Sequence, residues 1–445
     1  MKAFFRTLGI DETTWMAECN ATYKNGISFH GWSERPGCAS YFHPFPSPID
    51  AHTAPAFHYH CHARRRGVDL AACPDRFFLS AKLAAQRLAP IGYHNFPFEM
   101  AYGYHFDALL LGRFLRDHAT AKGVRHIEGK VVEVKRSETG NISELHLEDG
   151  RALSADFFID STGFRSLLLQ EALETPFVSY RDNLFNDAAV VLPMPPDAGG
   201  LRSETRSIAM GHGWRWEIPL TNRTGIGYVY ARDFCSADDA ERELRAALGL
   251  LDSPVEARHL SMKVGRVARH WVGNCLGVGL SQGFIEPLEA TALHLVLATV
   301  ETFIENFESN GFTNARQGAF NDAINARFEG VRDYIVCHYR MSQRSDTDYW
   351  RANAAIETLS PSLRAVLDCW FSGGDMREEI RRQDISRYYT AMSWQAMLGG
   401  YGHFPKKLRA PEADEKRFDM HVIDDFITRC ALNFPAHSDM LTGAT

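Results

Sequence analysis

The sequence predicts an α/β fold, with short strands in mixed and antiparallel sheets and an α-rich C-terminal part. Three observations lead to this prediction. Short β-rich runs recur between residues 126 and 164 and again between 204 and 233. A glycine-rich apolar run at 273–280 passes through a proline turn into a helical pattern, and helical spacing continues beyond residue 315. Strands should therefore dominate the middle of the chain and helices its last third.

The composition excludes several classes of partner. The 445 residues are 45% hydrophobic, enough for a large core, and the net charge of −7 argues against a nucleic-acid footprint. No apolar run approaches the ~18 residues of a membrane span. We therefore expect a small-molecule partner, with no nucleic acid and no membrane.

The cysteines and histidines predict neither disulfides nor a metal. Nine cysteines are scattered along the chain, and no secretory signal precedes them, so we expect a cytoplasmic protein without a disulfide framework. His58, His60, Cys61 and His62 are of ligand type, but no second ligand pair stands at a zinc-like spacing. We predict no metal site.

The N-terminal part begins with a predicted amphipathic helix over 1–16, followed by an alternating strand over 19–32. Alternation places Lys24 on the strand face opposite Tyr23, among small residues. The lysine is then either a solvated strand residue or a cation with room for a substrate beside it. Residues 33–104 are rich in proline, histidine and aromatic residues and predict long loops with short helices.

The next part predicts a helix over 105–124 and then three strands, at 126–136, 141–151 and 155–164. The last strand delivers three small or polar residues to its end, where α/β sheets place ligands. These residues are Asp160, Ser161 and Gly163. A tight turn that requires Asp and Gly is the alternative interpretation.

Residues 204–233 predict an antiparallel hairpin whose polar turn runs from Thr221 to Thr224. Trp214 and Trp216 share one strand face. Paired tryptophans at this spacing either belong to the core or form a wall between two ligand compartments.

Residues 273–296 combine a buried strand, a proline turn and a helix that should begin near Thr291. The start of such a helix presents unpaired N–H groups, which can bind an anion. Glu289 stands just outside this helix start. It is either a helix cap or a buried carboxylate with a catalytic role.

The last third predicts helices at 315–341, 362–370 and 376–400. Within the third of these, Asp384, Tyr388 and Tyr389 would fall on one face. Either this face packs internally or it binds a ring.

Several of these motifs, in this order and spacing, resemble the flavin-dependent tryptophan halogenase family along nearly the whole chain. The resemblance rests on CNATYK with Lys24, FHPF at 42–45, DFFIDSTGFR, GWRWEIP and GNCLGVGLSQGFIEPLEATA. It implies an FAD/NAD(P)-binding, flavin-monooxygenase-like module with mixed and antiparallel sheet insertions and an α-rich C-terminal substrate cap.

The resemblance also implies one intertwined domain over 1–445. Its discontinuous flavin module would comprise about 1–32, 105–165 and 260–310. The substrate and sheet part would comprise about 33–104 and 166–259, and the helical cap about 311–445.

The chemistry implied by the family uses reduced FAD from a separate reductase, O2, and chloride or bromide. Hypohalous acid formed from them would pass to Lys24, which would bind it as a hydrogen-bond donor or capture it as a haloamine. Glu289 would orient this oxidant or remove the ring proton. The halide would lie on the backbone of Thr291 and Ala292. The substrate would be an indole-like ring, tryptophan or a relative.

The family pattern assigns further contacts. The positions matching flavin contacts are Val131, Asp160, Ser161, Gly163, Leu280 and Leu293. The positions around the substrate are His43, Phe45, Asp384, Tyr388 and Tyr389. Trp214 and Trp216 would separate the two compartments, which disfavours a flavin monooxygenase. A homodimer is left open.

Three departures from the family pattern follow. Ala290-Thr291-Ala292 replaces the usual Ser-Thr-Gly, and an alanine at 292 would be strained if that position requires a positive φ. Asp384 is shorter than the acid that tryptophan-specific members use. The G-x-G-x-x-G turn is absent, so we expect a chain shortened at its start by about 55 to 60 residues. A noncatalytic homologue that no longer binds FAD productively is therefore an alternative function, and a flavin monooxygenase is a second.

Overall fold

The computed structural model describes residues 1–442. The helices are α1 (Lys2–Thr7), α2 (Glu12–Glu18), α3 (Ala54–Arg65), α4 (Leu79–Ala85), α5 (Ala108–Ala121), α6 (Ala237–Leu248), α7 (Ala292–Glu308), α8 (Gln317–Met341), α9 (Asp348–Ala354), α10 (Pro361–Phe371), α11 (Met376–Arg382), α12 (Ala391–Gly400), α13 (Met420–Ala431) and α14 (His437–Thr442). The strands are β1 (Thr22–Lys24), β2 (Gly26–His30), β3 (Ser40–Pro44), β4 (Gly103–His105), β5 (Val131–Arg136), β6 (Ile142–Leu147), β7 (Ala152–Ser154), β8 (Phe158–Asp160), β9 (Phe177–Ser179), β10 (Ala188–Met194), β11 (Thr205–Met210), β12 (Gly213–Pro219), β13 (Thr224–Tyr230), β14 (Arg258–Ser261), β15 (Gly265–Val267), β16 (Trp271–Val272), β17 (Cys275–Gly277) and β18 (Gly283–Phe284).

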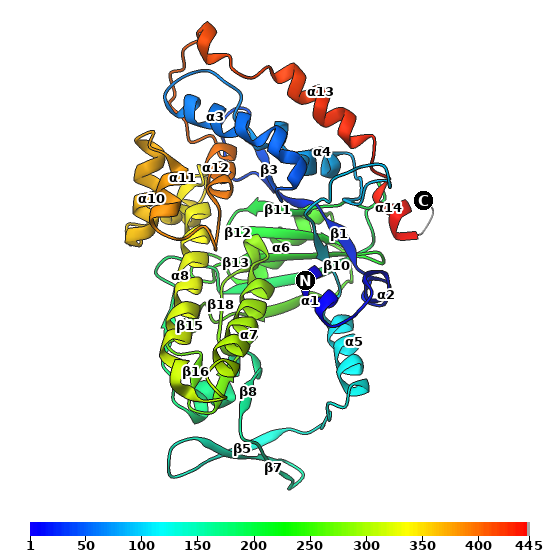
Figure 1. The fold of residues 1–445 in the computed structure, drawn as a ribbon, viewed down its shortest axis with the longest axis vertical. Helices are drawn as coiled ribbons and strands as arrows, with labels where there is room; N and C mark the ends of the chain where they lie inside the picture. Colours follow the sequence, from blue (N-terminus) through cyan, green and yellow to red (C-terminus); the bar gives the residue numbers. More distant parts are fainter. Residues whose placement is uncertain (443–445) are drawn as a thin grey trace.

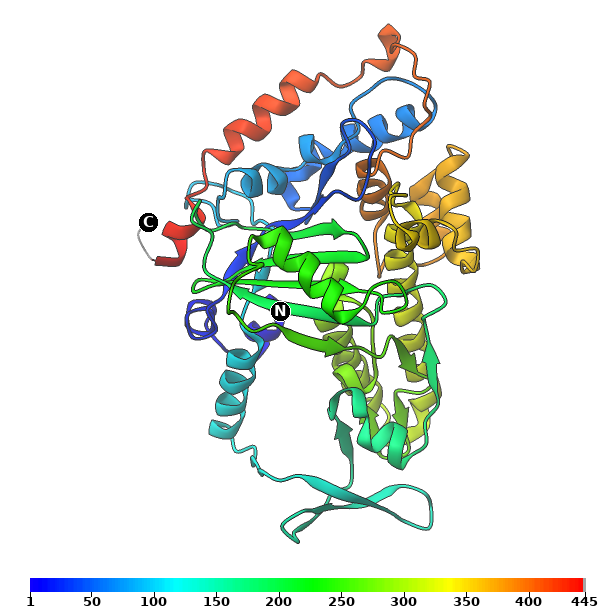
Figure 2. The ribbon, with the colours of Figure 1, turned by 180° about the vertical axis from the view of Figure 1, so that it is seen from behind.

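A seven-stranded mixed sheet forms the centre of the molecule, in the order β14-β10-β13-β12-β11-β2-β3. Only the β11–β2 pair is parallel among the described strands of this sheet. Helix α6 covers one face, as Figure 2 shows, and packs Ala240 and Leu244 against the sheet. The opposite face packs Phe29, Trp214 and Val229 into the same core as helix α8 (Figure 1). The sheet therefore lies between two apolar layers, one of which contains the longest helix.

Smaller sheets surround this centre. β17 pairs in parallel with β8 and antiparallel with β16, so that Gly277 lies opposite Asp160. β15 joins β9 and β18, β1 pairs with β4, and β5, β6 and β7 form a sheet that projects away from the centre in Figure 1. The fold class predicted from the sequence, an α/β molecule with mixed sheets and a helical C-terminal part, is confirmed.

The predicted hairpin at 204–233 is confirmed as β12 and β13, with β11 as a third strand. The predicted helix start at Thr291 is also confirmed, because Thr291 is the N-cap of α7. The prediction of one continuous helix over 1–16 is wrong, because the segment forms two helices, α1 and α2, separated by the turn at Gly9. A positive φ of 69° at this glycine ends the first helix.

Two further predictions need correction. The strand at 19–32 divides at Asn25 into β1 and β2, which belong to different sheets, so Lys24 does not share a sheet face with Gly26. The helix at 376–400 is interrupted over 383–390, where Asp384 adopts a left-handed φ of 54°. The positive φ ends the helical hydrogen-bond ladder there, and α12 restarts with Thr390 as its N-cap.

The helical C-terminal part and the segment 48–100 pack together in a second core, where α3 and α4 meet α12 and α13 (Figure 1). None of the helices described here is long and apolar enough to cross a membrane. Within residues 1–442, no group of three or more His, Cys, Asp or Glu is arranged to hold a metal ion. All nine cysteines are free.

Candidate active site

Lys24 ends strand β1 inside the protein, with only 4% of its surface exposed. Its register partner on β4 is Gly103, whose absent side chain leaves space beside the lysine stem. The ammonium lies 5.7 Å from the centre of the Phe45 ring. No carboxylate of the described residues forms an ion pair with it. The interpretation of Lys24 as a solvated strand lysine is therefore wrong, because the β1–β4 pair turns it inward.

Burial changes the protonation of this lysine. Desolvation lowers the pKa of Lys24 to about 8, against an opposing effect of the nearby Glu289 carboxylate. The ammonium and the neutral amine are therefore both accessible near neutral pH. Perturbed lysines in closed sites are candidates for catalysis.

Glu289 is held between two histidines from distant parts of the chain. Its Oε1 atom accepts a hydrogen bond from His338 Nε2 at 2.8 Å and lies 3.4 Å from His43 Nδ1. Burial opposes ionisation, but the two imidazoles hold the pKa of the Glu289 carboxyl well below its usual value. Glu289 is thus an ionised carboxylate in a closed site.

A further hydrogen bond orients His338. Its Nδ1 atom lies 2.7 Å from the hydroxyl of Tyr401. Because Nε2 must carry a proton to donate to Glu289, Nδ1 of the neutral imidazole accepts from the Tyr401 hydroxyl. The chain from Tyr401 through His338 to Glu289 fixes both the tautomer and the carboxylate.

The turn between Glu289 and α7 has the features of an anion site. Pro287–Glu289 form one 3-10 turn, Ala290 takes a left-handed φ of 55°, and Thr291 begins α7 without a side-chain cap. Thr291 Oγ1 is buried and has no hydrogen-bond partner among the described residues. The positive φ lies at Ala290 and not at Ala292, so the expected strain at Ala292 is corrected to the preceding position.

On the other side of this helix start lies an apolar cavity of about 200 Å³. It is lined by Gly279, Leu280, Phe284, Ala292 and Leu293, among others. Leu280 and Leu293 are 42% and 40% exposed, which is high for leucine beside a glycine-rich turn. The structure thus places Leu280, Ala292 and Leu293 together, with Glu289 on the inner side of the same turn.

The side chain of Asp160 points into the protein and not toward a surface where a ligand could bind. Its carboxylate is fully buried and accepts hydrogen bonds from the backbone of Leu168 and Leu169 and from Thr162. These bonds use both oxygens to cap the π-helical turn over 167–172. The Asp160 side chain therefore has a structural role at the strand end, and a contact between this residue and a flavin stays a prediction.

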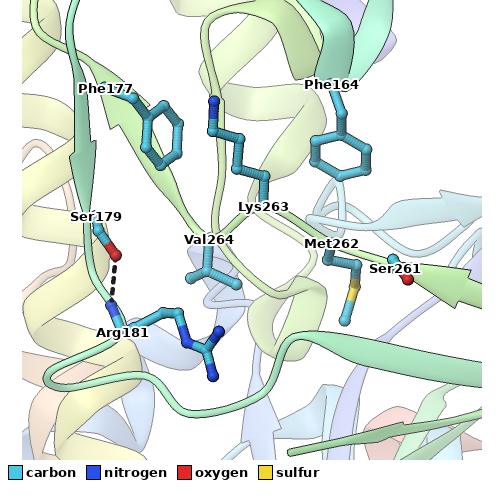
Figure 3. Close-up of a pocket in the computed structure, with 8 residues that line it drawn as sticks. All are labelled: Phe164, Phe177, Ser179, Arg181, Ser261, Met262, Lys263 and Val264. Atoms are coloured by element: carbon cyan, nitrogen blue, oxygen red, sulfur yellow. Dashed lines mark hydrogen bonds between the residues drawn. The ribbon is translucent and has the colours of Figure 1, made fainter. Parts of the chain in front are cut away.

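The other predicted flavin contacts differ in exposure, with Ser161 exposed and Gly163 and Val131 half-buried. Ser161 is exposed, and Gly163 has a φ of 73° with open space where a Cβ would stand. Val131 begins β5 in the projecting sheet. Beyond Gly163, a surface cavity of about 420 Å³ lies between the rings of Phe164 and Phe177 (Figure 3), and no predicted site residue lines it.

The two tryptophans of β12 are adjacent on one face, with ring centres 6.2 Å apart. Trp214 is buried and donates from Nε1 to Glu286 Oε2 at 2.8 Å. Trp216 lies over Gly227 of β13, where a Cβ would come within 2.0 Å of its ring. The Trp214 ring is therefore held by a hydrogen bond, and the Trp216 ring packs into the space that Gly227 leaves free.

The residues predicted around a substrate divide into two groups. His43 and Phe45 lie beside Glu289 and Lys24. Asp384 does not, because 78% of its side chain is exposed and it pairs with Arg387. The prediction that Asp384 shares a helix face with Tyr388 and Tyr389 is wrong, since the helix is interrupted there.

The two tyrosines of the interrupted segment have separate surroundings. Tyr389 stacks on Tyr334 of α8 with ring centres 3.5 Å apart. Tyr388 lies over Gly330 and beneath the guanidinium groups of Arg327 and Arg387. Tyr389 therefore belongs to the aromatic surroundings of His338, whereas Tyr388 is a half-buried residue between two cations.

Sequence reasoning missed three residues of this site, namely His338, Tyr401 and Tyr334. His338 stood on the apolar stripe of the predicted helix at 315–341, where a polar ring is unusual. A histidine at a buried helix position could have indicated a site residue, because a buried imidazole requires a hydrogen-bond partner. Nothing in the sequence indicated which carboxylate it would hold.

Comparison with known proteins gives one consistent answer. The family model described as tryptophan halogenase matches residues 1–415. Tryptophan 6-halogenase SttH of Streptomyces toxytricini is 34% identical, covering 94% of this chain and 84% of the relative. Its crystal structure has a TM-score of 0.83 and 31% identity, covering 100% of this chain and 90% of the other.

Two further relatives agree. Tryptophan 7-halogenase RebH of Lentzea aerocolonigenes is 35% identical, covering 91% of this chain and 80% of the relative. The structure of Tar14, a tryptophan C-6 flavin-dependent halogenase (chlorinase) from taromycin biosynthesis, has a TM-score of 0.84 and 32% identity, covering 100% and 89% of the two chains.

Proposed function

This chain belongs to the tryptophan halogenase family, and from that premise we propose that it halogenates an indole-like ring with reduced FAD, O2 and chloride or bromide. The observation that supports the proposal best is the buried Lys24 ammonium beside the Glu289 carboxylate, which two histidines hold in place. A closed site of this kind can handle a reactive oxidant while it keeps water away.

The residues on the outer side of the α7 start fit a flavin. Leu280, Leu293 and Ala292 offer an apolar surface for a planar ring, and Gly279 leaves space beside it. When bound, reduced flavin supplies, with dioxygen, the oxidising equivalent that converts halide to hypohalous acid. Val131, Ser161 and Gly163 are the further positions that we assign to this side, and a separate reductase would supply the reduced cofactor.

The start of α7 would hold the halide. Thr291 and Ala292 present backbone N–H groups at the positive end of a 17-residue helix, and the Thr291 hydroxyl is an additional buried donor. The site lies between the apolar cavity and Glu289. An anion bound there would be close to both compartments.

Lys24 would receive the hypohalous acid. As an ammonium it donates a hydrogen bond to the oxygen of the oxidant. As an amine it attacks the halogen, the oxygen–halogen bond breaks, and hydroxide leaves with one amine proton as water, so that the lysine becomes a haloamine. A pKa of about 8 makes both forms available. The two routes differ in their pH dependence, because the first requires the protonated and the second the neutral lysine.

Glu289 would take the proton that the ring loses after electrophilic attack. Its lowered pKa keeps it ionised at neutral pH, as a proton acceptor requires. Both imidazoles contact Oε1, which leaves Oε2 for the oxidant or for the departing proton. His43 and Phe45 would face the arene.

Trp214 and Trp216 would form the wall between the flavin and the arene. Such a wall prevents direct oxygen transfer to the ring and so disfavours a monooxygenase. Asp384 is exposed and paired with Arg387, so we assign it no contact with the substrate. The arene is therefore proposed as an indole or a related electron-rich ring, with Tyr389 near its site and Tyr388 at the edge.

The experiment incubates the chain with FAD, NADH, a flavin reductase, bromide or chloride, and a panel of indoles, followed by mass spectrometry. We expect a halogenated product with the parent chain. Lys24→Ala should give none while flavin binding is retained. Bound flavin without any halogenated product would contradict the proposal, hydroxylated product without halide would indicate a monooxygenase, and no flavin affinity at all would favour a noncatalytic homologue.

A further inference from the structure

The turn that carries Glu289 contains a second buried carboxylate, Glu286, which the proposed chemistry does not use. Only 1% of its surface is exposed. Its Oε2 atom accepts from Trp214 Nε1 at 2.8 Å, from Asn186 Nδ2 at 2.9 Å and from the Tyr339 hydroxyl at 2.5 Å. Its Oε1 atom is buried and has no partner among the described residues. Three donors thus converge on one oxygen.

The surroundings of the two carboxylates differ in kind. Glu289 faces two imidazoles and an ammonium, whereas the hydrogen-bond donors around Glu286 are an indole, an amide and a phenol. Burial raises the pKa of Glu286, although its three hydrogen bonds oppose this effect. Two carboxyl groups in one turn whose pKa values are shifted in opposite directions have different roles.

The donors to Glu286 connect it to the rest of the site. Tyr339 follows His338 on α8, so adjacent residues of one helix hold Glu286 and Glu289. Asn186 is held in turn by the hydroxyl of Tyr349 on α9, at 3.0 Å. The carboxylate therefore joins the strand of the tryptophans to two helices.

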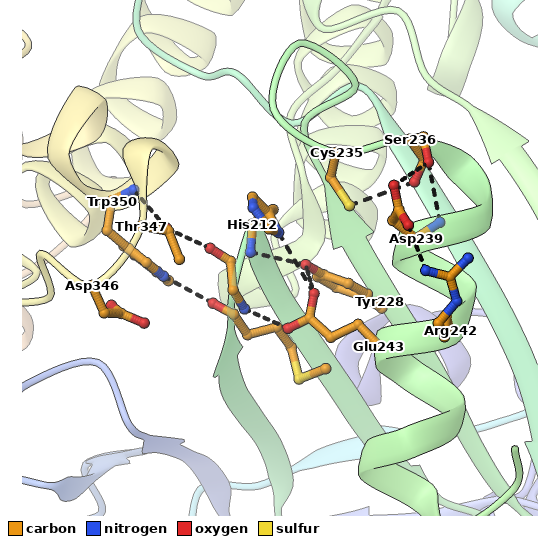
Figure 4. A network of polar contacts seen from close by, with 12 residues as sticks. His212, Tyr228, Cys235, Ser236, Asp239, Arg242, Glu243, Asp346, Thr347 and Trp350 are labelled. Carbon is orange, nitrogen blue, oxygen red and sulfur yellow. Dashed lines mark hydrogen bonds and ion pairs between the residues drawn. The ribbon is translucent and has the colours of Figure 1, made fainter.

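The strand of Trp214 is also fixed at its beginning, in the network of Figure 4. Glu243 Oε1 accepts from the backbone N–H of Gly211 at 2.6 Å. Thr347, the N-cap of α9, donates to the carbonyl of Gly211, and Trp350 of α9 donates to the carbonyl of Met210. With the backbone anchored, the Trp214 side chain still requires an acceptor for its N–H, and Glu286 supplies it.

We propose that Glu286 is a positioning residue that holds the indole of Trp214 in the wall between the two compartments and, through the adjacent pair Tyr339 and His338, keeps that wall in register with Glu289. The inference rests on the proposed halogenase function. Loss of the acceptor would leave a buried indole N–H unsatisfied, which is unfavourable. The ring would then turn away, and oxidant could pass the wall without meeting Lys24.

The test compares three variants. Glu286→Gln keeps an oxygen for the three donors and places its amide nitrogen at the position of the unpartnered Oε1. Glu286→Met removes the acceptor at similar size. Tyr339→Phe is the matched control, because it removes one donor to Glu286 but keeps the bond to Trp214.

The first measurement does not depend on activity. Ultraviolet resonance Raman difference spectra against Trp214→Phe isolate the indole N–H signal of Trp214. We expect a hydrogen-bonded N–H in the parent, in Glu286→Gln and in Tyr339→Phe, and a free N–H in Glu286→Met. The same N–H signal in the parent and in Glu286→Met would overturn the proposed placement.

The second measurement is the amount of halogenated product per NADH oxidised. We expect Glu286→Gln to stay near the parent and Glu286→Met to fall about tenfold or more, since small displacements in a closed site are costly. A Glu286→Met yield equal to that of the parent would overturn the positioning role. If Glu286→Met does not fold, Trp214→Phe makes the same comparison, because it removes the N–H and keeps a ring.

The two proposals fail separately. A parent chain that binds flavin but halogenates nothing contradicts the proposed function, while the Raman comparison still decides whether Glu286 holds Trp214. A halogenating parent with an unchanged Raman signal in Glu286→Met contradicts only the positioning role.

Discussion

Lys24 is a single residue of the site that destabilises the fold. An ammonium group buried without an ion pair is costly, and nothing in the β1–β4 pair requires a charge at that position. Burial nevertheless gives the amine a pKa of about 8. The buried lysine therefore lowers the stability of the fold, a cost that the proposed catalytic role would explain.

Replacing this lysine should stabilise the protein. The difference between a pKa of about 8 and the ordinary 10.5 corresponds to about 3 kcal/mol at neutral pH. Because the folded-state pKa is the lower one, the penalty is complete below pH 8 and disappears as the pH rises through 10.5. We expect Lys24→Met to raise the free energy of unfolding by up to this amount at pH 7, measured by urea denaturation.

The matched control for that measurement is Lys122→Met, an exposed lysine at the end of α5. It should change stability little at any pH. A Lys24→Met chain that is less stable than the parent at pH 7 would show that the lysine is not a destabilising group.

Glu289→Gln tests the carboxylate. The amide keeps the contact to His338 but cannot accept a proton, so the halogenation rate should fall about 10²-fold. The carboxylate raises the pKa of Lys24, so its removal should also move the lysine-dependent limb of the rate profile to lower pH. Rates measured between pH 6 and 9 test both effects, and an unmoved limb would contradict the coupling between Lys24 and Glu289.

At the residue scale the sequence identified which residues lie together better than it identified their hydrogen-bond partners. Lys24 and Glu289 were identified by motif, although they are 265 positions apart, and the structure places them in one buried site. His338 was missed because its partner comes from another element, and single-sequence patterns do not reveal such pairs. Asp384 was misplaced because one left-handed residue interrupts the helix.

At the level of elements, the turn after β18 shows how backbone geometry orients the residues of the site. Ala290 occupies a left-handed conformation in which alanine is strained. The strained residue separates the 3-10 turn of Glu289 from the start of α7, so the carboxylate and the helix N–H groups can point to different sides. Backbone conformation therefore directs the Glu289 side chain inward, and His338 and His43 then hold its carboxylate.

A pair of glycine substitutions tests this geometry. Ala290→Gly should raise stability by about 1 kcal/mol, because glycine has no penalty in the left-handed region. Ala292→Gly should lower it by roughly 0.5–1 kcal/mol, since that residue is helical. Thermal unfolding measures both, and a destabilising Ala290→Gly would show that the positive φ is not strained.

At the element level, strong periodicity was predictive. The helices at 317–341 and 361–371 and the hairpin of β12 and β13 were expected close to where they lie. The regions of weak periodicity, such as 33–104, concealed α3, whose 12 residues include four histidine and cysteine side chains. A helix with so few apolar residues is formed through packing against α12 and α13, which local sequence does not show.

Across the whole molecule, the positions assigned to the flavin come from separate segments. Val131 lies in the projecting sheet of β5–β7 (Figure 1). Leu280 lies in the 3-10 turn Gly279–Ser281 and Leu293 in the first turn of α7, and both line one cavity. Most residues of β5 are exposed, whereas most residues of β10 and β13 in the seven-stranded sheet are buried. Stability is therefore uneven, and the projecting sheet should open most easily.

Hydrogen exchange followed by mass spectrometry tests this arrangement. Without ligand, amides of β5 should exchange much faster than those of β10 and β13. Added FAD should slow exchange in β5 and around Leu280 and Leu293 together, if these segments form one binding surface. Protection at α7 without any change in β5 would remove Val131 from the flavin site.

The adjacent pair His338 and Tyr339 has a consequence for how such an enzyme can be diversified. Since one turn of α8 holds both carboxylates of the Glu286–Glu289 segment, a substitution in that turn would disturb both carboxylates at once. The 383–390 segment, by contrast, is an exposed interruption between two helices. Libraries that seek new arenes should therefore begin with that interruption, and leave α8 and the mostly buried α12 intact.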